Sequence, residues 1–277
     1  MIIVRLKGGI GNQMFQYALG RVLALKNNTG LELDTSFLNL NLTTVTKRNF
    51  SLDVFNIEAK IIESSYLVML FRRIFQRKGR EKTFNFDKKI LSIGSDVSLD
   101  GYWHSPKYFA GFEDVIRKDF TPKNPPVQNI QNLMDEIRNQ NSLCIHVRRE
   151  DYVGNKYYEV INSEYYERGI EYISSKTALE KIYVFSDDID WCRGNLSFKL
   201  PTMFVGDEYA GLKNEGHMYL MSKCRNFIIA NSSFSWWGAW LSSYKDKIVV
   251  CPKQWFGDAS RDTSDLIPED WIPLEII

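Results

Sequence analysis

The sequence changes abruptly from apolar to charged in the stretch Leu143-Cys144-Ile145-His146-Val147-Arg148-Arg149. Its first part suits a buried strand, and two adjacent arginines follow. Guanidinium groups at the end of a buried strand are unfavourable unless an anion meets them. Because arginine presents a planar fork of donors that matches phosphate, the stretch favours a phosphate-binding strand end. The alternative is a local ion pair with Glu150 or Asp151.

Apolar runs typical of strands recur through the second half of the chain, with helical patterns between several of them. These runs are Leu143–Val147, Lys181–Phe185, Thr202–Val205, Phe227–Ala230 and Lys247–Cys251. Strands that alternate with helices predict a parallel, doubly wound α/β sheet. A strand–helix–strand pattern over residues 2–34 predicts a similar unit at the start of the chain.

Residues 121–126 form the best candidate for a linker, because their three prolines block both a helix and a central strand. We therefore expect an N-terminal domain of residues 1–125 and a C-terminal domain of residues 126–277. The expected arrangement includes the option that the C-terminal tail packs back on the first domain. A chain of 277 residues is long enough for two such domains.

The composition excludes several classes of protein. A formal charge of +1 favours no general binding of nucleic acid. The four cysteines form no Cys-x-x-Cys pair, and the presence of only three histidines argues against a zinc cluster. Cys144 and Cys251 lie inside apolar runs and are expected to be small buried hydrophobic residues, which indicates a reducing compartment. No stretch reaches the roughly 20 apolar residues that span a bilayer. The basic segment 72–82 follows an apolar run, so it is either the solvated end of a core helix or a peripheral membrane contact.

Polar side chains follow three of the predicted strands, where parallel sheets bind their ligands. Arg148 and Arg149 follow the first strand, and Asp187 and Asp188 follow the second. The third is followed by Ser232, Ser233, Phe234 and Ser235. Arginines suit a diphosphate, a carboxylate suits guanine or ribose, and serines at a helix start complete a phosphate site. These strand ends therefore predict a nucleoside diphosphate site.

The alternation of side chains along a strand places His146 and Arg148 on one face and Arg149 on the other. We expect Arg148 to meet the phosphate and Arg149 to pair with an acid. The tryptophans of the stretch 236–240 form either a wall for a base or sugar, or core packing between sheet and helix.

The loop Lys7–Gln13 at the start of the first helix has two interpretations. Its spaced glycines resemble a dinucleotide fingerprint, which would indicate an oxidoreductase, but Met14 stands where that fingerprint needs a small residue. We prefer a loop that binds sugar hydroxyls or a phosphate, with Gly11, Asn12 and Gln13 facing a cleft. Asp188 and Asp190 match a loose metal-binding pattern, yet the arginines already provide charge for phosphates, so we expect no metal.

Four motifs together resemble those of the α-1,2-fucosyltransferases in glycosyltransferase family 11. The motifs begin with GGIGNQMFQYA at Gly8, HVRREDY at His146, FSDD at Phe185 and NSSFSWWG at Asn231. The family often has glycine at the position of Glu150. The resemblance covers nearly the whole chain and implies an α/β, GT-B-like fold with two Rossmann-like domains and a cleft between them.

The resemblance also implies a reaction. An inverting enzyme would move L-fucose from GDP-β-L-fucose to the 2-hydroxyl of a terminal galactoside, on an oligosaccharide or lipid-linked glycan, without metal or cofactor. Domain 1–125 would then hold the acceptor and domain 126–277 the donor. Arg148, Asp151 and His146 are the catalytic candidates, with Asp151 or His146 as the general base. The setting it implies is the bacterial cytoplasm, with the inner membrane surface as an option and surface polysaccharide as the product.

Two rival functions remain open. One is another nucleotide-sugar transferase of related fold, with a different linkage or an O-fucosyltransferase-like activity. The other is a non-catalytic carbohydrate-binding protein, which would not need an arginine pair and an acid pair on neighbouring strand ends.

Overall fold

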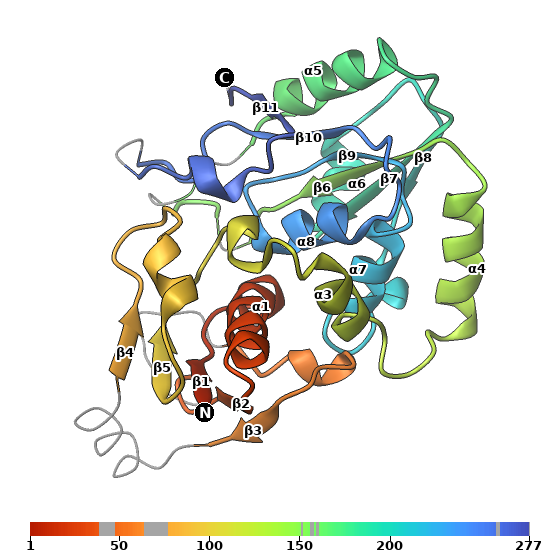
Figure 1. Cartoon of the computed structure of the whole chain (residues 1–277). Helices are drawn as coiled ribbons and strands as arrows, with labels where there is room; N and C mark the ends of the chain where they lie inside the picture. Colours follow the sequence, from red (N-terminus) through yellow and green to blue (C-terminus); the bar gives the residue numbers. More distant parts are fainter. Residues whose placement is uncertain are drawn as a thin grey trace. The chain divides into compact units, whose positions relative to one another are not determined.

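The computed structural model describes residues 1–38, 48–63, 77–150, 152–155, 158, 161–258 and 261–276. The chain divides into two compact units, which are described separately below (Figure 1). One unit contains Met1–Asn124 and Asp262–Leu266, and the other contains Pro125–Arg261 and Ile267–Ile277. The change of unit after Asn124 lies within the proline-rich linker, one residue from the expected boundary. Asp151 and residues 72–76 of the basic segment lie outside the described residues.

The first unit is built on a parallel sheet with the strand order β3-β2-β1-β5-β4. Its strands are β1 (Ile2–Arg5), β2 (Leu31–Asp34), β3 (Lys60–Ile62), β4 (Arg77–Arg80) and β5 (Val97–Asp100). Its helices and helical turns are α1 (Ile10–Lys26), η1 (Leu52–Val54), η2 (Lys88–Ser92), η3 (Pro106–Phe109), α3 (Glu113–Asp119) and η5 (Ser264–Leu266). The apolar β1 occupies the middle of the sheet, where both of its edges are covered.

Helix α1 packs directly on β1 and β2 because one of its residues has no side chain (Figure 1). A Cβ on Gly20 would lie 2.5 Å from Cγ2 of Val4 and 2.9 Å from Cδ1 of Leu31. A second glycine makes the turn into the helix, since Gly8 has a φ of +78°. The strand–helix–strand pattern predicted for residues 2–34 is confirmed.

The second unit contains a parallel sheet with the strand order β11-β10-β9-β6-β7-β8. Its strands are β6 (Ser142–Val147), β7 (Lys181–Ser186), β8 (Thr202–Phe204), β9 (Asn226–Ile228), β10 (Val249–Pro252) and β11 (Ile272–Leu274). Its helices and helical turns are α4 (Gln128–Arg138), α5 (Ser163–Ser174), α6 (Ile189–Asn195), η4 (Asp207–Tyr209), α7 (Glu215–Met221) and α8 (Ser233–Leu241). All five predicted strands of this half are present, and the alternation with helices is confirmed.

Strand β6 is central, and its two faces meet different helices. Leu143, Ile145 and Val147 pack into a core cluster with residues of α5 and α6. His146, on the opposite face, lies with its ring centroid 5.7 Å from that of Phe234 in α8. The sheet is therefore covered on both sides, as a parallel sheet requires. Two parallel α/β units of this kind confirm the α/β, GT-B-like fold class.

The cysteines are buried, and the C-terminal segment contributes to both units. All four cysteines are buried free thiols, as expected for Cys144 and Cys251. Residues 262–266 belong to the first unit, where Asp265 accepts hydrogen bonds from the Phe86 backbone N–H at 2.8 Å and from Lys107 at 2.5 Å. Strand β11 then pairs with β10 in the second unit. Within the described ranges, no helix combines the length and apolar character needed to cross a membrane.

Candidate functional site

The arginine pair lies at the carboxyl end of β6, beside the carboxyl end of β7. The two strands run in parallel register with Val147 opposite Ser186, so the residues that follow each strand are also neighbours. Arg148 Nη1 lies 3.1 Å from Asp187 Oδ2, and Arg149 Nε lies 3.2 Å from Asp188 Oδ2. The sequence offered a phosphate grip or a local ion pair. In the described part of the chain, the two arginines form ion pairs with the acids that follow β7.

Asp187 organises the loop that follows β6. Its Oδ1 accepts the backbone N–H of Arg149 at 2.9 Å, and its Oδ2 accepts that of Glu150 at 3.1 Å in addition to the Arg148 ion pair. A carboxylate with three such contacts holds the backbone and one guanidinium in a fixed position. The expectation that Asp187 binds guanine or ribose gains no support from this placement.

Asp188 and Arg149 are fixed against α6. Asp188 Oδ1 caps that helix by accepting the Trp191 backbone N–H at 3.2 Å, while its Oδ2 pairs with Arg149. The Arg149 guanidinium carbon lies 3.6 Å above the Trp191 ring, within the range of a cation–π contact. Asp190, the other acid of the loose metal pattern, pairs with Arg193 at 2.7 Å. Arg149 is therefore the arginine that pairs with an acid on the α6 side.

Arg148 lies on the side of α8. Its guanidinium carbon is 5.7 Å from the centre of the Tyr152 ring. The Tyr152 hydroxyl donates a hydrogen bond of 2.8 Å to the carbonyl of Asn231, the residue that leads into α8. The alternation along β6 thus sends the two arginines in different directions, as predicted. Tyr152 therefore links Arg148 to the residue that precedes the serines.

His146 is buried, with only 4% of its surface exposed. Burial lowers the pKa of His146 to about 3, and the nearby positive charges of Arg148 and His217 contribute in the same direction. Its Nδ1 has no hydrogen-bond partner among the described residues, while its backbone carbonyl accepts a bond of 3.3 Å from Tyr166. An imidazole with so low a pKa is a weak proton acceptor, so this geometry disfavours His146 as the general base.

The serines after β9 build the start of α8. Ser232 is the N-cap, and its Oγ accepts the Phe234 backbone N–H at 3.3 Å. Ser235 is fully buried and donates to the carbonyls of Ala230 and Ser232. Ser233 and Phe234 are half-buried, so they are the members of this group with exposed surface. An N-terminal helix end of this kind offers backbone N–H groups to an anion.

The tryptophans of α8 are core residues. Trp236 and Trp237 are fully buried, and their ring centroids lie 5.0 Å apart. Trp236 also packs against Trp240 at 6.2 Å and Trp271 at 5.4 Å. The interpretation of these rings as a wall for a base or sugar is wrong, because their faces are used in packing.

The predicted sugar-binding loop belongs to the first unit, and its residues have different surroundings. Gln13 is fully buried and bonds to the carbonyls of Gly8 and Asn49 and the N–H of Ser51, which leaves its amide no capacity for a sugar. Asn12 Oδ1 lies 3.0 Å from Nε2 of His104. Gly11 is buried at the start of α1. The amide of Gln13 therefore holds the loop in shape.

The first unit contains a second group of polar residues, which was not predicted from the sequence. Glu81 accepts the backbone N–H groups of Tyr102 and Trp103 at 2.7 and 2.8 Å. Burial raises the pKa of Glu81 despite these two bonds. The aromatic and polar stretch 101–106 directly after an apolar strand was the signal that could have found the group.

Comparison with known proteins identifies the family. The profile described as Glycosyl transferase family 11 matches residues 1–275. The chain belongs to glycosyltransferase family 11. An alpha-1,2-colitosyltransferase of Escherichia coli is 34% identical, over 99% of this chain and 99% of its own length.

Two further relatives differ in their sequence identity and in the share of their own length that the match covers. The O-antigen biosynthesis glycosyltransferase WbnK of Escherichia coli is 32% identical, over 97% of this chain and 99% of its own length. A galactoside 2-alpha-L-fucosyltransferase of Caenorhabditis elegans is 24% identical, over 99% of this chain and 77% of its own length. This family 11 member is therefore similar to sugar transferases of both bacteria and animals.

Proposed function

We propose that this family 11 glycosyltransferase moves L-fucose from GDP-β-L-fucose to the 2-hydroxyl of a terminal galactoside, with inversion to an α-1,2 linkage. The observation that carries the proposal is the arginine pair at the end of β6, a strand that pairs in the sheet with β9, which leads into α8. Asp187 holds Arg148, and Asp188 holds Arg149 on the α6 side. Fixed cations next to a helix N-terminus suit a diphosphate leaving group. The relatives named for α-1,2 transfer and for galactoside fucosylation support the same linkage and acceptor.

The proposed reaction is a single displacement. The acceptor oxygen forms a bond to the anomeric carbon of fucose as the bond from that carbon to the β-phosphate oxygen breaks. The bonding electrons leave with GDP, and the proton of the acceptor hydroxyl passes to a base. Arg148 stabilises the negative charge that develops on the β-phosphate. Because the guanidinium supplies this positive charge, the proposed reaction needs no metal. Asp151, which lies outside the described residues, remains the sequence-based candidate for the base.

A second donor has a specific observation in its favour. The Escherichia coli relative named as a colitosyltransferase is 34% identical along the whole chain. Colitose is fucose without its 3-hydroxyl. A site that hydrogen-bonds the 3-hydroxyl would reject colitose by about 10⁴-fold or more, whereas an apolar site would separate the two sugars only weakly. The ratio of rates with the two donors therefore distinguishes the alternatives.

The test is a transfer assay with GDP-fucose and GDP-colitose, each in the presence of excess EDTA. Lactose, N-acetyllactosamine and β-galactosyl-N-acetylgalactosamine are the acceptors, and NMR of the product gives the linkage and anomeric configuration. We expect an α-1,2-linked fucoside that forms at the same rate with and without EDTA. A β-linked product, loss of transfer in EDTA, or transfer from colitose alone would each contradict the proposal.

Surface glycan synthesis in the cytoplasm, where nucleotide sugars are made, is the proposed setting. The relative named for O-antigen biosynthesis supports it. Lipid-linked glycans would then be natural acceptors, and contact of the basic segment 72–82 with the inner membrane stays a prediction.

A further inference from the structure

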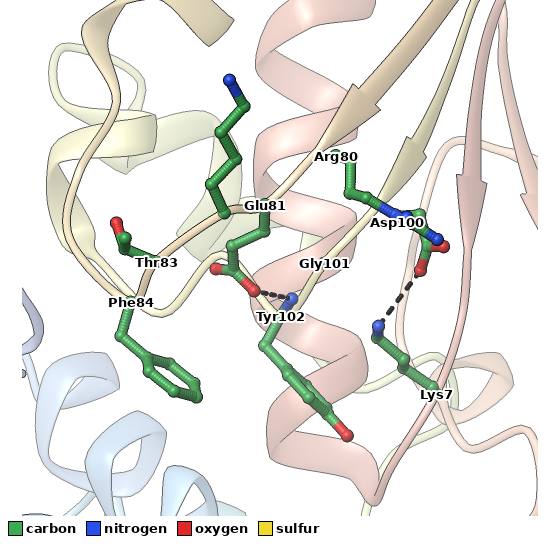
Figure 2. A pocket seen from close by; sticks show the side chains of 9 residues that line it. Lys7, Arg80, Glu81, Thr83, Phe84, Asp100, Gly101 and Tyr102 are labelled. Atoms are coloured by element: carbon green, nitrogen blue, oxygen red, sulfur yellow. Dashed lines mark hydrogen bonds and ion pairs between the residues drawn. The ribbon is translucent and has the colours of Figure 1, made fainter. Parts of the chain in front are cut away.

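A pocket of about 320 Å³ lies at the carboxyl edge of the sheet in the first unit (Figure 2). Its lining comes from the residues that follow β1, β4 and β5, the ends at which parallel sheets bind ligands. This volume falls within the usual range of small-molecule sites and suits a single sugar ring. The arginine pair belongs to the other unit, and all the residues that line this pocket belong to the first unit.

The pocket carries more positive than negative side chains. Lys7, Arg80 and Lys82 line it together with Glu81 and Asp100. Figure 2 shows Asp100 paired with Lys7, at 3.1 Å, and a second ion pair joins Asp100 to Arg5 outside the lining at 3.3 Å. The single carboxylate of Asp100 therefore forms two ion pairs and also lies near the charge of Arg80. The site favours an anion because its cations outnumber its acids.

Lys82 and Glu81 differ in whether their charged groups are already used in hydrogen bonds within the protein. Lys82 is exposed and has no hydrogen-bond or ion-pair partner in the part of the chain that the structure describes. Glu81 uses both carboxylate oxygens on the backbone of Tyr102 and Trp103. The acid that lines the pocket is thus occupied, while the ammonium group of Lys82 is available.

Two aromatic side chains add an apolar surface. Phe84 and Tyr102 are half-buried, and Figure 2 shows both rings extending to the same side of Glu81. The Lys7 ammonium lies 4.7 Å from the centre of the Tyr102 ring. Aromatic faces beside charged groups suit a sugar ring, which has apolar C–H faces and a polar rim.

The backbone beneath Tyr102 is held in an unusual conformation. Trp103 has a φ of +60°, which is unfavourable for a bulky residue, and the two hydrogen bonds to Glu81 hold it there. A Cβ on Gly101 would lie 2.5 Å from Cβ of Glu81 and 2.6 Å from the Trp103 ring. This close packing fixes the position of Tyr102 in advance of any ligand.

We infer that this pocket binds a pyranose ring that carries an anionic group, with the ring against Phe84 and Tyr102 and the anion near Arg80 and Lys82. The anion is a carboxylate, as in a uronic acid, or a phosphate attached to the sugar. Such a sugar would be a non-reacting part of the acceptor glycan, and this last step rests on the proposed function. The pocket would then select acidic glycans as acceptors.

Direct binding tests the pocket without any transfer reaction. Titrations would compare the binding of methyl β-D-glucuronide, glucose 1-phosphate and methyl β-D-glucoside to the full chain, first without GDP and then with saturating GDP. We expect at least one anionic sugar to bind about tenfold more tightly than the neutral glucoside, with an advantage that shrinks in high salt. The anion that binds better identifies the source of the charge. Equal binding of all three, or displacement by GDP, would overturn the inference.

A pair of matched lysine variants assigns the binding to this pocket. Lys82→Gln should weaken the binding of the anionic sugar about threefold and leave the glucoside unchanged, since one exposed charge is lost. Lys88→Gln is the control, because Lys88 is an exposed lysine of the same unit that does not line the pocket. Equal weakening in both variants would show that the effect comes from general charge.

Transfer assays then separate the two proposals. A galactosyl-β-glucuronide and the corresponding galactosyl-β-glucoside would serve as acceptors with GDP-fucose. Lys82→Gln should raise KM for the glucuronide about threefold with kcat unchanged. Binding of the acidic sugar without any transfer would contradict the proposed function alone. Transfer to both acceptors with equal KM, and no preference in binding, would contradict the pocket alone.

Discussion

The carboxyl edges of the two sheets differ in how fully their cations are paired with acids. At the β6–β7 edge, each arginine has an acid of its own from the neighbouring strand, and those acids also hold backbone groups. At the β1–β5 edge, Asp100 is shared by Arg5 and Lys7, and the acid Glu81 is used on the backbone. The first edge is a rigid array of paired charges, whereas the second keeps a surplus of cations.

This difference indicates two uses of the same topology. Charges that are fixed before a ligand arrives require no reorganisation during a reaction, which favours electrostatic stabilisation of a transition state. Loosely compensated cations on a surface pocket attract an anion but hold it less specifically, which suits recognition. Under the proposals above, the edge in the second unit would carry the chemistry and the edge in the first would select the acceptor.

Replacing Arg148 tests the strongest part of this contrast. We expect Arg148→Ala to lower kcat by about 100- to 1,000-fold, as the loss of one transition-state donor does elsewhere. Arg148→Lys should recover little, because an ammonium group cannot reproduce the planar fork that Asp187 positions. Turnover with GDP-fucose and lactose is the measurement.

Arg193→Ala provides the matched control for Arg148. Arg193 is half-exposed on α6 and pairs with Asp190 at 2.7 Å within one helical turn, a pair that contributes little. Its removal should leave kcat within about twofold of the unaltered enzyme. Near-normal turnover by Arg148→Lys would remove Arg148 from its central place in the mechanism.

Replacing Asp187 tests whether the paired edge is rigid. Asp187→Asn keeps the shape of the side chain but places an amide where Oδ2 accepts from Arg148 and from the Glu150 backbone. We expect the free energy of unfolding to fall by about 2 kcal/mol, because hydrogen bonds to a poorly exposed charge are lost. Urea unfolding measures the change. Asp190→Asn, at a side chain 89% exposed, should cost far less, and equal losses would show that Asp187 holds nothing in place.

Much of this arrangement follows from local sequence patterns. Apolar runs that end at Val147 and Phe185 identify two strand ends to within one residue, and the period of two along β6 separates Arg148 from Arg149. These features depend on neighbours in the chain, which a single sequence displays. The proline-rich stretch near residue 124 likewise marks the change of unit.

Pairings between distant residues are what the sequence did not reveal. Both Asp187 and Gln13 have the chemistry of ligand-binding groups, yet one holds the backbone at Arg149 and the other holds it at Ser51. Glu81 meets Tyr102 only because β4 and β5 are neighbours in the sheet. The burial of Trp236 against Trp271 also depends on the folded sheet. The sequence identifies polar side chains that could bind a ligand. Only the folded topology shows whether such a side chain binds another part of the protein instead.

Replacing Asp100 tests the loosely compensated edge, with a smaller expected effect. Burial opposes the charge of Asp100, but Lys7, Arg5 and Arg80 together lower its pKa below the ordinary value of 3.8. A depressed folded pKa means that the stabilisation is present above pH 3.8 and is lost as the pH falls through the folded pKa. Asp100→Asn should therefore be less stable than the unaltered protein at pH 7 by about 1 kcal/mol, and this gap should close in acid.

The same variant should have the opposite effect on the pocket. Removing one of the two acids that line it leaves Lys7 and Arg80 less compensated, so methyl β-D-glucuronide should bind about threefold more tightly at pH 7. Urea unfolding between pH 3 and 7 gives the stability, and titration gives the affinity. Burial and, to a smaller extent, the charge of Asp100 raise the pKa of Glu81, so its contribution is lost as the pH rises, and this loss should be smaller in the variant because the Asp100 charge is gone. A stability gap that stays constant with pH, or weaker binding of the glucuronide, would show that the β1–β5 edge is as fully paired as the β6–β7 edge.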